Sequence, residues 1–137
     1  MKIIFVLNNP KRMQGISDLE LNDNGIEQAN NIREVIENKN IDIIIVSPLK
    51  RAIQTAKIIN LNMQKEVIID ERIIEMNFGH LEGKVYSEDY WNFDFDYKSI
   101  NGENISDFQK RIYGFIEDIK NKYKEKNVLI VAHRRSI

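Results

Sequence analysis

Residues 41–56 form the most informative stretch of the chain, IDIIIVSPLKRAIQTA. The β-branched run Ile41–Val46 is typical of a strand that is buried on both faces of a parallel sheet. Ser47 suits the N-cap of a helix and Pro48 suits its first position. Apolar residues then recur at helical spacing as far as Ile59. The stretch therefore predicts a strand followed directly by a helix, which is the repeating unit of α/β proteins.

The same alternation of strand and helix patterns extends along the rest of the chain. Short apolar runs predict strands at 2–7, 41–46, 67–69 and 128–132, and helical periodicity predicts helices at 26–36, 49–59 and 108–123, the last opened by a capping box at 106–109. We expect an α/β fold in three layers, with a mostly parallel sheet and helices on both faces. Residues 1–137 are expected to form one domain, truncated at its C-terminal end because a buried strand is followed by so few residues.

Composition narrows the classes of function. The 137 residues are 42% hydrophobic and 30% charged, with a net charge of -1 and no cysteine. This balance gives no bias toward nucleic acid or anionic membranes, and it excludes disulfides. No apolar stretch approaches the length of a transmembrane helix, so we expect a cytoplasmic protein without membrane or nucleic-acid partners. The aromatic residues at 86–97 are more typical of a lid or packing cluster than of a base-stacking platform, because no basic groove separates them.

Candidate functional residues follow the expected strands. Ligands of open α/β sheets bind beyond the carboxyl ends of the strands, and those ends lie near Asn8, at Ser47–Arg51 and at His133. Each candidate also has a structural reading. Arg51 would be a solvated helix charge and His133 a satisfied structural histidine, and Glu75, after the third strand, would be an edge carboxylate.

Six segments, in order, resemble motifs of the histidine phosphatase superfamily, the phosphoglycerate mutase-like proteins. The residues 47–56 resemble the SPLxRAxQTA segment of that family, and the match runs over nearly the whole chain. The other segments are RMQG at 12–15 with Asp18 and Leu21, NGIEQA at 24–29, EMNFGHLEG at 75–83, GEN at 102–104 and VLIVAH at 128–133.

The resemblance implies a chemistry and a set of roles. Family members hydrolyse phosphomonoesters or transfer phosphoryl groups by way of a phosphohistidine. Carried over to this chain, Arg51 would clamp phosphate, His133 would be the second histidine and Glu75 would be the general acid. Asn8 and Arg12 match the family's loop and would touch phosphate or substrate. The resemblance implies a small phosphorylated substrate or ligand, no cofactor and no metal. It does not identify the particular substrate or the oligomeric state, and it does not distinguish a mutase from a phosphatase.

The chain also departs from the family pattern. In the family, the first strand runs into an Arg-His-Gly motif that carries the nucleophile, whereas here Val6 is followed by Leu7 and Asn8. The flanks fit if about six residues are missing between Val6 and Leu7. Asparagine cannot replace the histidine, because its amide nitrogen is a poor nucleophile toward phosphorus. Arg134–Arg135 replace the family's Gly-Gly, where they would either bind an anion or block the pocket.

Three interpretations remain open from the sequence. The chain is a phosphatase framework whose phosphohistidine chemistry is impaired, or a non-catalytic module that binds a phosphorylated ligand. The third interpretation is an unrelated α/β interaction domain, which predicts that Arg51, Glu75 and His133 lie far apart. Whether the chain is an active enzyme is not decided at this stage.

Overall fold

The computed structural model describes residues 1–8, 13–85 and 87–136, with the side chain of Asn8 left out. Within these residues, four strands alternate with three α-helices. In chain order they are β1 (Lys2–Asn8), α1 (Asp23–Ile36), β2 (Ile43–Val46), α2 (Lys50–Ile59), β3 (Glu66–Ile69), α3 (Ile105–Lys122) and β4 (Asn127–His133). Single 3-10 turns follow β3 and β4 and interrupt the long connection before α3.

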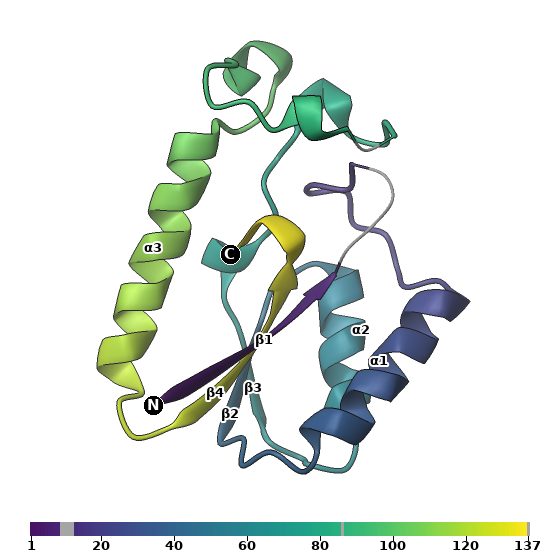
Figure 1. The fold of residues 1–137 in the computed structure, drawn as a ribbon, viewed down its shortest axis with the longest axis vertical. Helices are drawn as coiled ribbons and strands as arrows, with labels where there is room; N and C mark the ends of the chain where they lie inside the picture. The colour runs from purple at the N-terminus through teal and green to yellow at the C-terminus, as the bar shows by residue number, and fades with distance from the viewer. Residues whose placement is uncertain (9–12, 86, 137) are drawn as a thin grey trace.

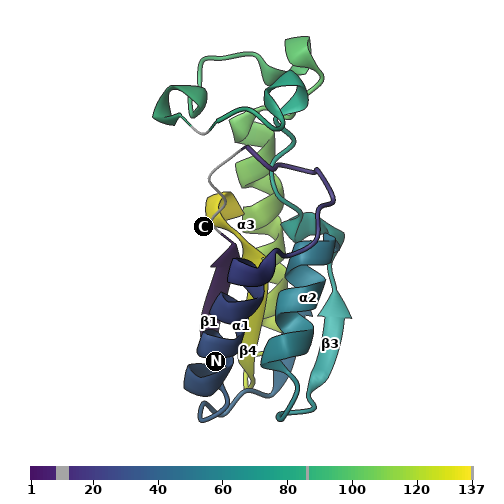
Figure 2. The ribbon, with the colours of Figure 1, turned by 90° about the vertical axis from the view of Figure 1, so that its right-hand side faces the viewer.

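The sheet is parallel throughout, with the strand order β1-β4-β2-β3. The connections from β1 to β2 and from β2 to β3 move in one direction across the sheet, whereas the connection from β3 to β4 returns. Since crossovers between parallel strands are right-handed, α1 and α2 must cover one face and α3 the other. Figures 1 and 2 show this three-layer arrangement, with β4 between β1 and β2. The expected fold class is confirmed.

Alternate residues of the two inner strands build two separate cores. Ile43 and Ile45 of β2 belong to the cluster that contains the buried side chains of α3. Ile44 and Val46 belong to the cluster that contains Ile36 of α1 and the buried apolar side chains of α2. This division follows from the two-residue period of a strand, and it explains why β2 is a continuous apolar run.

Two helix starts differ from the sequence prediction. Ser47 and Pro48 lie before α2, whose N-cap is Leu49 and has no side-chain capping bond. The Asp18 carboxylate instead accepts a hydrogen bond from the Lys50 N–H at 2.7 Å. The predicted capping box at 106–109 is also wrong, because α3 already begins at Ile105.

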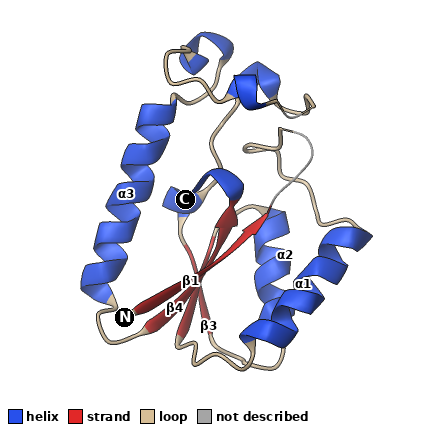
Figure 3. Ribbon diagram, in the orientation of Figure 1, coloured by secondary structure: helices blue, strands red, loops and turns tan. Residues whose placement is uncertain are grey.

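The long connection before α3 lies beyond the carboxyl ends of the strands, at the top of Figures 1 and 3. Its aromatic residues form packing contacts. Tyr97 is 1% exposed and its ring meets that of Phe95 edge-on, with centroids 4.8 Å apart. Trp91 meets Phe93 in the same way, and Tyr86 lies outside the described residues. The segment stands over the end of the sheet at which the candidate residues gather.

Candidate functional site at the strand ends

Ser47 and His133 meet at the carboxyl ends of β2 and β4. The two strands are paired up to Val46 and Val131, and the Ser47 N–H donates to the Val131 carbonyl at 3.0 Å. The Ser47 Oγ lies 2.7 Å from Nε2 of His133. Both residues are at most 1% exposed, so the contact is shielded from solvent.

The surroundings of His133 keep its ring neutral. Burial lowers the pKa of His133 to about 3, and the charges of Arg51 and Arg111 lower it further. A protonated ring would be a third positive charge in this interior, where solvation is poor. His133 is therefore neutral at pH 7 and acts as a hydrogen-bonding group rather than as a cation.

Arg51 lies in the first turn of α2 and binds the backbone of the loop that follows β1. Its Nη1 donates to the Ser17 carbonyl at 2.7 Å, and its Nη2 donates to the Gln14 and Gly15 carbonyls at 2.8 Å each. The side chain is buried, which lowers the pKa of Arg51, while the charges of Glu75, Glu82 and Asp18 raise it again. The guanidinium therefore ties loop 14–17 to the first turn of α2, and its role as a phosphate clamp stays a prediction.

Glu75 is also buried, at 5% exposure. Its Oε1 accepts a hydrogen bond from the Met76 N–H at 2.9 Å, and the Arg135 backbone also donates to the carboxylate. Burial raises the pKa of Glu75 to about 7, against the opposing effects of these bonds and of the Arg51 and Arg135 charges. A carboxyl group with a pKa near 7 can hold and release a proton under ordinary conditions.

Arg51, Glu75 and His133 lie near enough to one another for the arginine charge to act on both other groups. Arg51 affects the pKa of both Glu75 and His133. The sequence placed these three residues on three separate segments, and the structure brings them together. The interpretation as an unrelated domain, which required them to lie apart, is wrong.

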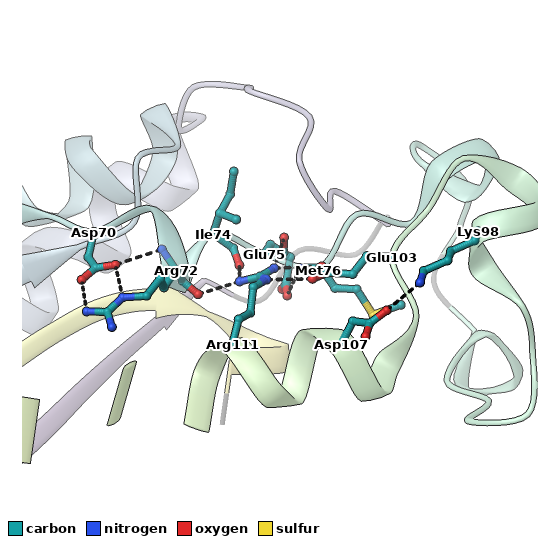
Figure 4. Close-up of polar contacts among 9 residues, drawn as sticks. All are labelled: Asp70, Arg72, Ile74, Glu75, Met76, Lys98, Glu103, Asp107 and Arg111. Atoms are coloured by element: carbon teal, nitrogen blue, oxygen red, sulfur yellow. Dashed lines mark hydrogen bonds and ion pairs between the residues drawn. The ribbon is translucent and has the colours of Figure 1, made fainter. Parts of the chain in front are cut away.

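Arg111 on α3 was missed by the sequence analysis. Its Nη1 donates to the carbonyls of Arg72 and Ile74 at 2.6 and 2.8 Å, and its Nη2 donates to the Glu75 carbonyl at 3.2 Å. Its Nε and Nη2 also bind the two carboxylate oxygens of Glu103 at 2.8 and 2.9 Å, as Figure 4 shows. Arg111 thus fixes the backbone that carries Glu75. The carbonyls lie 36–39 residues away in the sequence, so no local pattern signalled this contact.

Other residues of the matched motifs tie the loop after β1 to its neighbours. The Glu82 carboxylate accepts from the Ile16 N–H at 2.9 Å and from the Ser17 hydroxyl at 2.6 Å. The Gln54 side chain accepts from the Leu21 N–H at 2.7 Å. Gly15 has no room for a side chain, because a Cβ there would lie 2.3 Å from the Met76 carbonyl oxygen. The motifs therefore stabilise one another around Arg51.

The arginine pair after β4 is anchored to the long connection. Arg134 forms an ion pair with Glu88 at 3.7 Å. The Arg135 guanidinium lies 4.5 Å from the centre of the Trp91 ring, an arrangement typical of a cation–π contact. Both arginines thus link the end of β4 to residues 88–91, which gives them a structural role that the sequence analysis had not considered.

Asn8 and Arg12 can be placed only in part. Asn8 is the last residue of β1, and its backbone lies opposite His133 in the β1–β4 register. Its side chain and the whole of Arg12 lie outside the described residues, so both roles stay predictions. The other histidine, His80, is exposed, and its Nε2 lies 3.1 Å from Asn101 Nδ2.

Cavities, metal sites and membrane-spanning helices were the remaining features to consider in the described residues. A cavity of about 510 Å³ lies between β1, α3 and the end of β4, with Arg135 and Ser136 but neither Glu75 nor His133 in its lining. Among residues 1–8, 13–85 and 87–136, no cluster of acidic or histidine side chains has the arrangement of a metal site. None of the described helices is long and apolar enough to cross a membrane.

These features define an α/β protein with a buried histidine, arginine and glutamate at the ends of parallel strands. Residues 6–137 match the model of the histidine phosphatase superfamily (branch 1). The chain belongs to this superfamily, as its motifs indicated.

Individual relatives agree with this assignment. The chain is 33% identical over 130 residues to the uncharacterized phosphatase PhoE of Bacillus subtilis, covering 95% of this chain and 67% of the relative. It is 29% identical over 132 residues to phosphoserine phosphatase 1 of Hydrogenobacter thermophilus, covering 89% and 63%. The chain thus spans about two thirds of the length of these curated relatives, or slightly less.

A solved structure extends the comparison to three dimensions. The phosphoserine phosphatase of Entamoeba histolytica, in complex with 3-phosphoglyceric acid, superposes with a TM-score of 0.78 at 30% identity. The superposition covers 98% of this chain and 74% of the other. The three-layer fold is therefore shared with a phosphatase whose ligand is a small phosphorylated acid.

Proposed function

We propose that the strand-end cluster is the phosphomonoester site of a histidine phosphatase framework, and that phosphohistidine chemistry is impaired in this chain. The observation that carries the proposal is the convergence of buried Arg51, Glu75 and His133 at the ends of β2 and β4. A site of this kind combines a fixed positive charge, a neutral hydrogen-bonding ring and a protonatable carboxyl group.

Each group has a distinct task in phosphoryl transfer. Arg51 supplies positive charge beside the phosphoryl oxygens, where charge develops in the transition state. His133 binds an oxygen without adding charge. Glu75, whose pKa is raised to about 7, protonates the leaving oxygen. Arg111 is a positioning residue, because it holds the Glu75 backbone.

The impairment concerns the nucleophile. The chain has two histidines, and they are His133 and the exposed His80. At the end of β1, Asn8 stands opposite His133, where a second imidazole would be needed. Since an amide nitrogen does not attack phosphorus efficiently, we expect binding of a phosphomonoester with little or no turnover.

The substrate class is a small phosphomonoester. The relatives support this, since two of them are phosphoserine phosphatases. The site geometry does not favour a mutase over a phosphatase.

A repair experiment tests the proposal. The chain is assayed for hydrolysis of p-nitrophenyl phosphate beside a variant with about six residues, including Arg-His-Gly, inserted between Val6 and Leu7. The matched control carries the same insertion with alanine in place of the inserted histidine. Turnover is expected only from the histidine insertion, and it should be abolished by Arg51→Ala in that background. Turnover by the chain itself that survives His133→Ala and Arg51→Ala would overturn the proposal.

Ligand binding by the chain itself gives an independent measurement. Inorganic phosphate should raise the melting temperature progressively, because a ligand that binds only the folded state stabilises it by mass action. The same result would be expected of a non-catalytic binding module, and the repaired variant distinguishes the two. A module that never had the chemistry gains no turnover from the insertion.

A further inference from the structure

Ser47 has a contact that its position in the sequence did not suggest. The sequence predicted that Ser47 caps α2, but it does not, because that helix begins only at Lys50. Its hydroxyl is fully buried, lies 2.7 Å from His133 Nε2 and accepts a longer bond from the Leu49 N–H at 3.4 Å. The partner of the hydroxyl is thus the one histidine of the candidate site.

Counting donors and acceptors distinguishes the forms of the His133 ring. If Nε2 carried the proton, it would donate to the Ser47 Oγ, and the Ser47 hydroxyl hydrogen would have no acceptor among the described residues. The Nδ1 lone pair would also be left without a partner, because Nδ1 has none in that part of the chain. If Nδ1 carries the proton, the hydroxyl donates to Nε2 and a single group, the Nδ1–H, is left over. Each buried polar group without a partner is costly.

We propose that Ser47 is a positioning residue that fixes His133 as the neutral Nδ1–H tautomer and thereby presents Nδ1–H as a donor to a phosphoryl oxygen. The second half of this inference rests on the proposed phosphomonoester site. The tautomer itself does not, since it follows from contacts within the protein.

The surroundings of the ring support a role for the remaining donor. Nδ1 of His133 is buried and has no hydrogen-bond partner among the described residues. The charges of Arg51 and Arg111 act on the same ring, so its neighbourhood is positive. An anion accepts from the Nδ1–H and is attracted by these charges, whereas a cation is repelled. The ligand chemistry that fits is an oxyanion.

The first test is the nitrogen spectrum of the histidine rings in the ¹⁵N-labelled chain at pH 7. With two histidines in the sequence, a His80→Gln variant assigns both rings. His133 should show a protonated, pyrrole-type Nδ1 and an unprotonated, pyridine-type Nε2. A protonated Nε2 in the unsubstituted chain would overturn the inference, and this result does not depend on whether any substituted variant folds.

The second test removes the hydroxyl. Ser47→Ala should change the His133 ring from a single tautomer to a mixture or to the Nε2–H form. Ser136→Ala is the matched control, because Ser136 is buried in the 3-10 turn that follows β4 and its Oγ has no hydrogen-bond partner within the described chain. The control should leave the His133 spectrum unchanged. An unaltered tautomer in a folded Ser47→Ala protein would contradict the role of Ser47.

Inorganic phosphate separates the two halves of the inference. The His133 Nδ1–H proton resonance should shift on titration with phosphate, and Ser47→Ala should weaken phosphate binding about tenfold, through loss of the favoured donor. An Nδ1–H tautomer that phosphate leaves unperturbed would retain the role of Ser47 and remove both the donor role and the proposed site. An Nε2–H tautomer would remove the inference even if phosphate binds.

Discussion

Arg51 and Arg111 make comparable contacts on opposite faces of the sheet, but their charges are compensated differently. Arg51 on α2 donates to the backbone of loop 14–17, and Arg111 on α3 donates to the backbone of residues 72–75. Each arginine thus ties an irregular segment to the helix that carries the arginine. Arg111 also forms a bidentate ion pair with Glu103, whereas the hydrogen bonds that the Arg51 guanidinium makes within the described chain go to carbonyls.

The difference separates a structural arginine from a functional candidate. Glu103 forms a contact ion pair with Arg111, so Arg111 already has a carboxylate partner. Arg51 is buried at 4% exposure and is influenced by Glu75, Glu82 and Asp18 only through space. A buried arginine without a contacting carboxylate is costly to maintain, and an oxyanion would supply the missing partner.

Removing Arg111 should have the largest effect on stability. Arg111→Met would leave Glu103 without its partner and remove the donors to three carbonyls, with an expected loss of about 3 kcal/mol in the free energy of unfolding. Urea denaturation measures this loss, and Arg111→Lys, which keeps the charge but not the fork of donors, should fall in between. A loss below about 1 kcal/mol for Arg111→Met would show that the ion pair is a solvated surface contact.

Glu75 provides the second test, because Arg111 binds its carbonyl and the Arg51 charge acts on its carboxylate. Its pKa is 4.5 when unperturbed and about 7 in the folded protein. Below pH 4.5 both states are protonated and there is no penalty. As the pH rises toward 7, the unfolded state releases its proton while the folded state retains it, so stability is lost and stays low above pH 7.

Glu75→Gln should remove this pH dependence, since glutamine resembles the protonated acid. The variant should match the unsubstituted chain near pH 4 and be more stable by about 2 kcal/mol at pH 8. His133, whose pKa is lowered to about 3, destabilises both proteins as the pH falls below 6.5, and this effect cancels in the difference. Equal stability differences at pH 4 and pH 8 would show that Glu75 is not a buried acid.

Arg51→Met should have a smaller effect on stability and a larger one on binding. The loss of three carbonyl partners is offset by removing a buried charge, so the expected cost is about 1 kcal/mol. The rise in melting temperature with inorganic phosphate should disappear, whereas Arg111→Lys should retain it. A phosphate response that survives Arg51→Met would make Arg51 a second structural arginine, and the proposed difference between Arg51 and Arg111 would be wrong.

The sequence predicted the elements and the candidate cluster better than it predicted the contacts. Strands and helices follow from local periodicity, and Arg51 and His133 follow strand ends that can be identified from apolar runs. The N-cap prediction for Ser47 was wrong because His133, 86 residues away, takes its hydroxyl. Arg111 was missed for the same reason, since its partners are brought to it by the fold.

Arg72 supplies the last and smallest test of how charge compensation depends on exposure. It forms ion pairs with Asp70 and Asp118, and the Asp118 side chain is 67% exposed. Since water and salt screen such a pair, Asp118→Asn should cost at most about 0.5 kcal/mol. Asp70→Asn should cost more, because Asp70 is 20% exposed and also accepts from the Arg72 backbone N–H at 2.9 Å. Urea denaturation measures the loss in the free energy of unfolding. Equal losses for the two variants would mean that exposure does not control the strength of these ion pairs. The contrast drawn between Arg51 and Arg111 would then lack a physical basis.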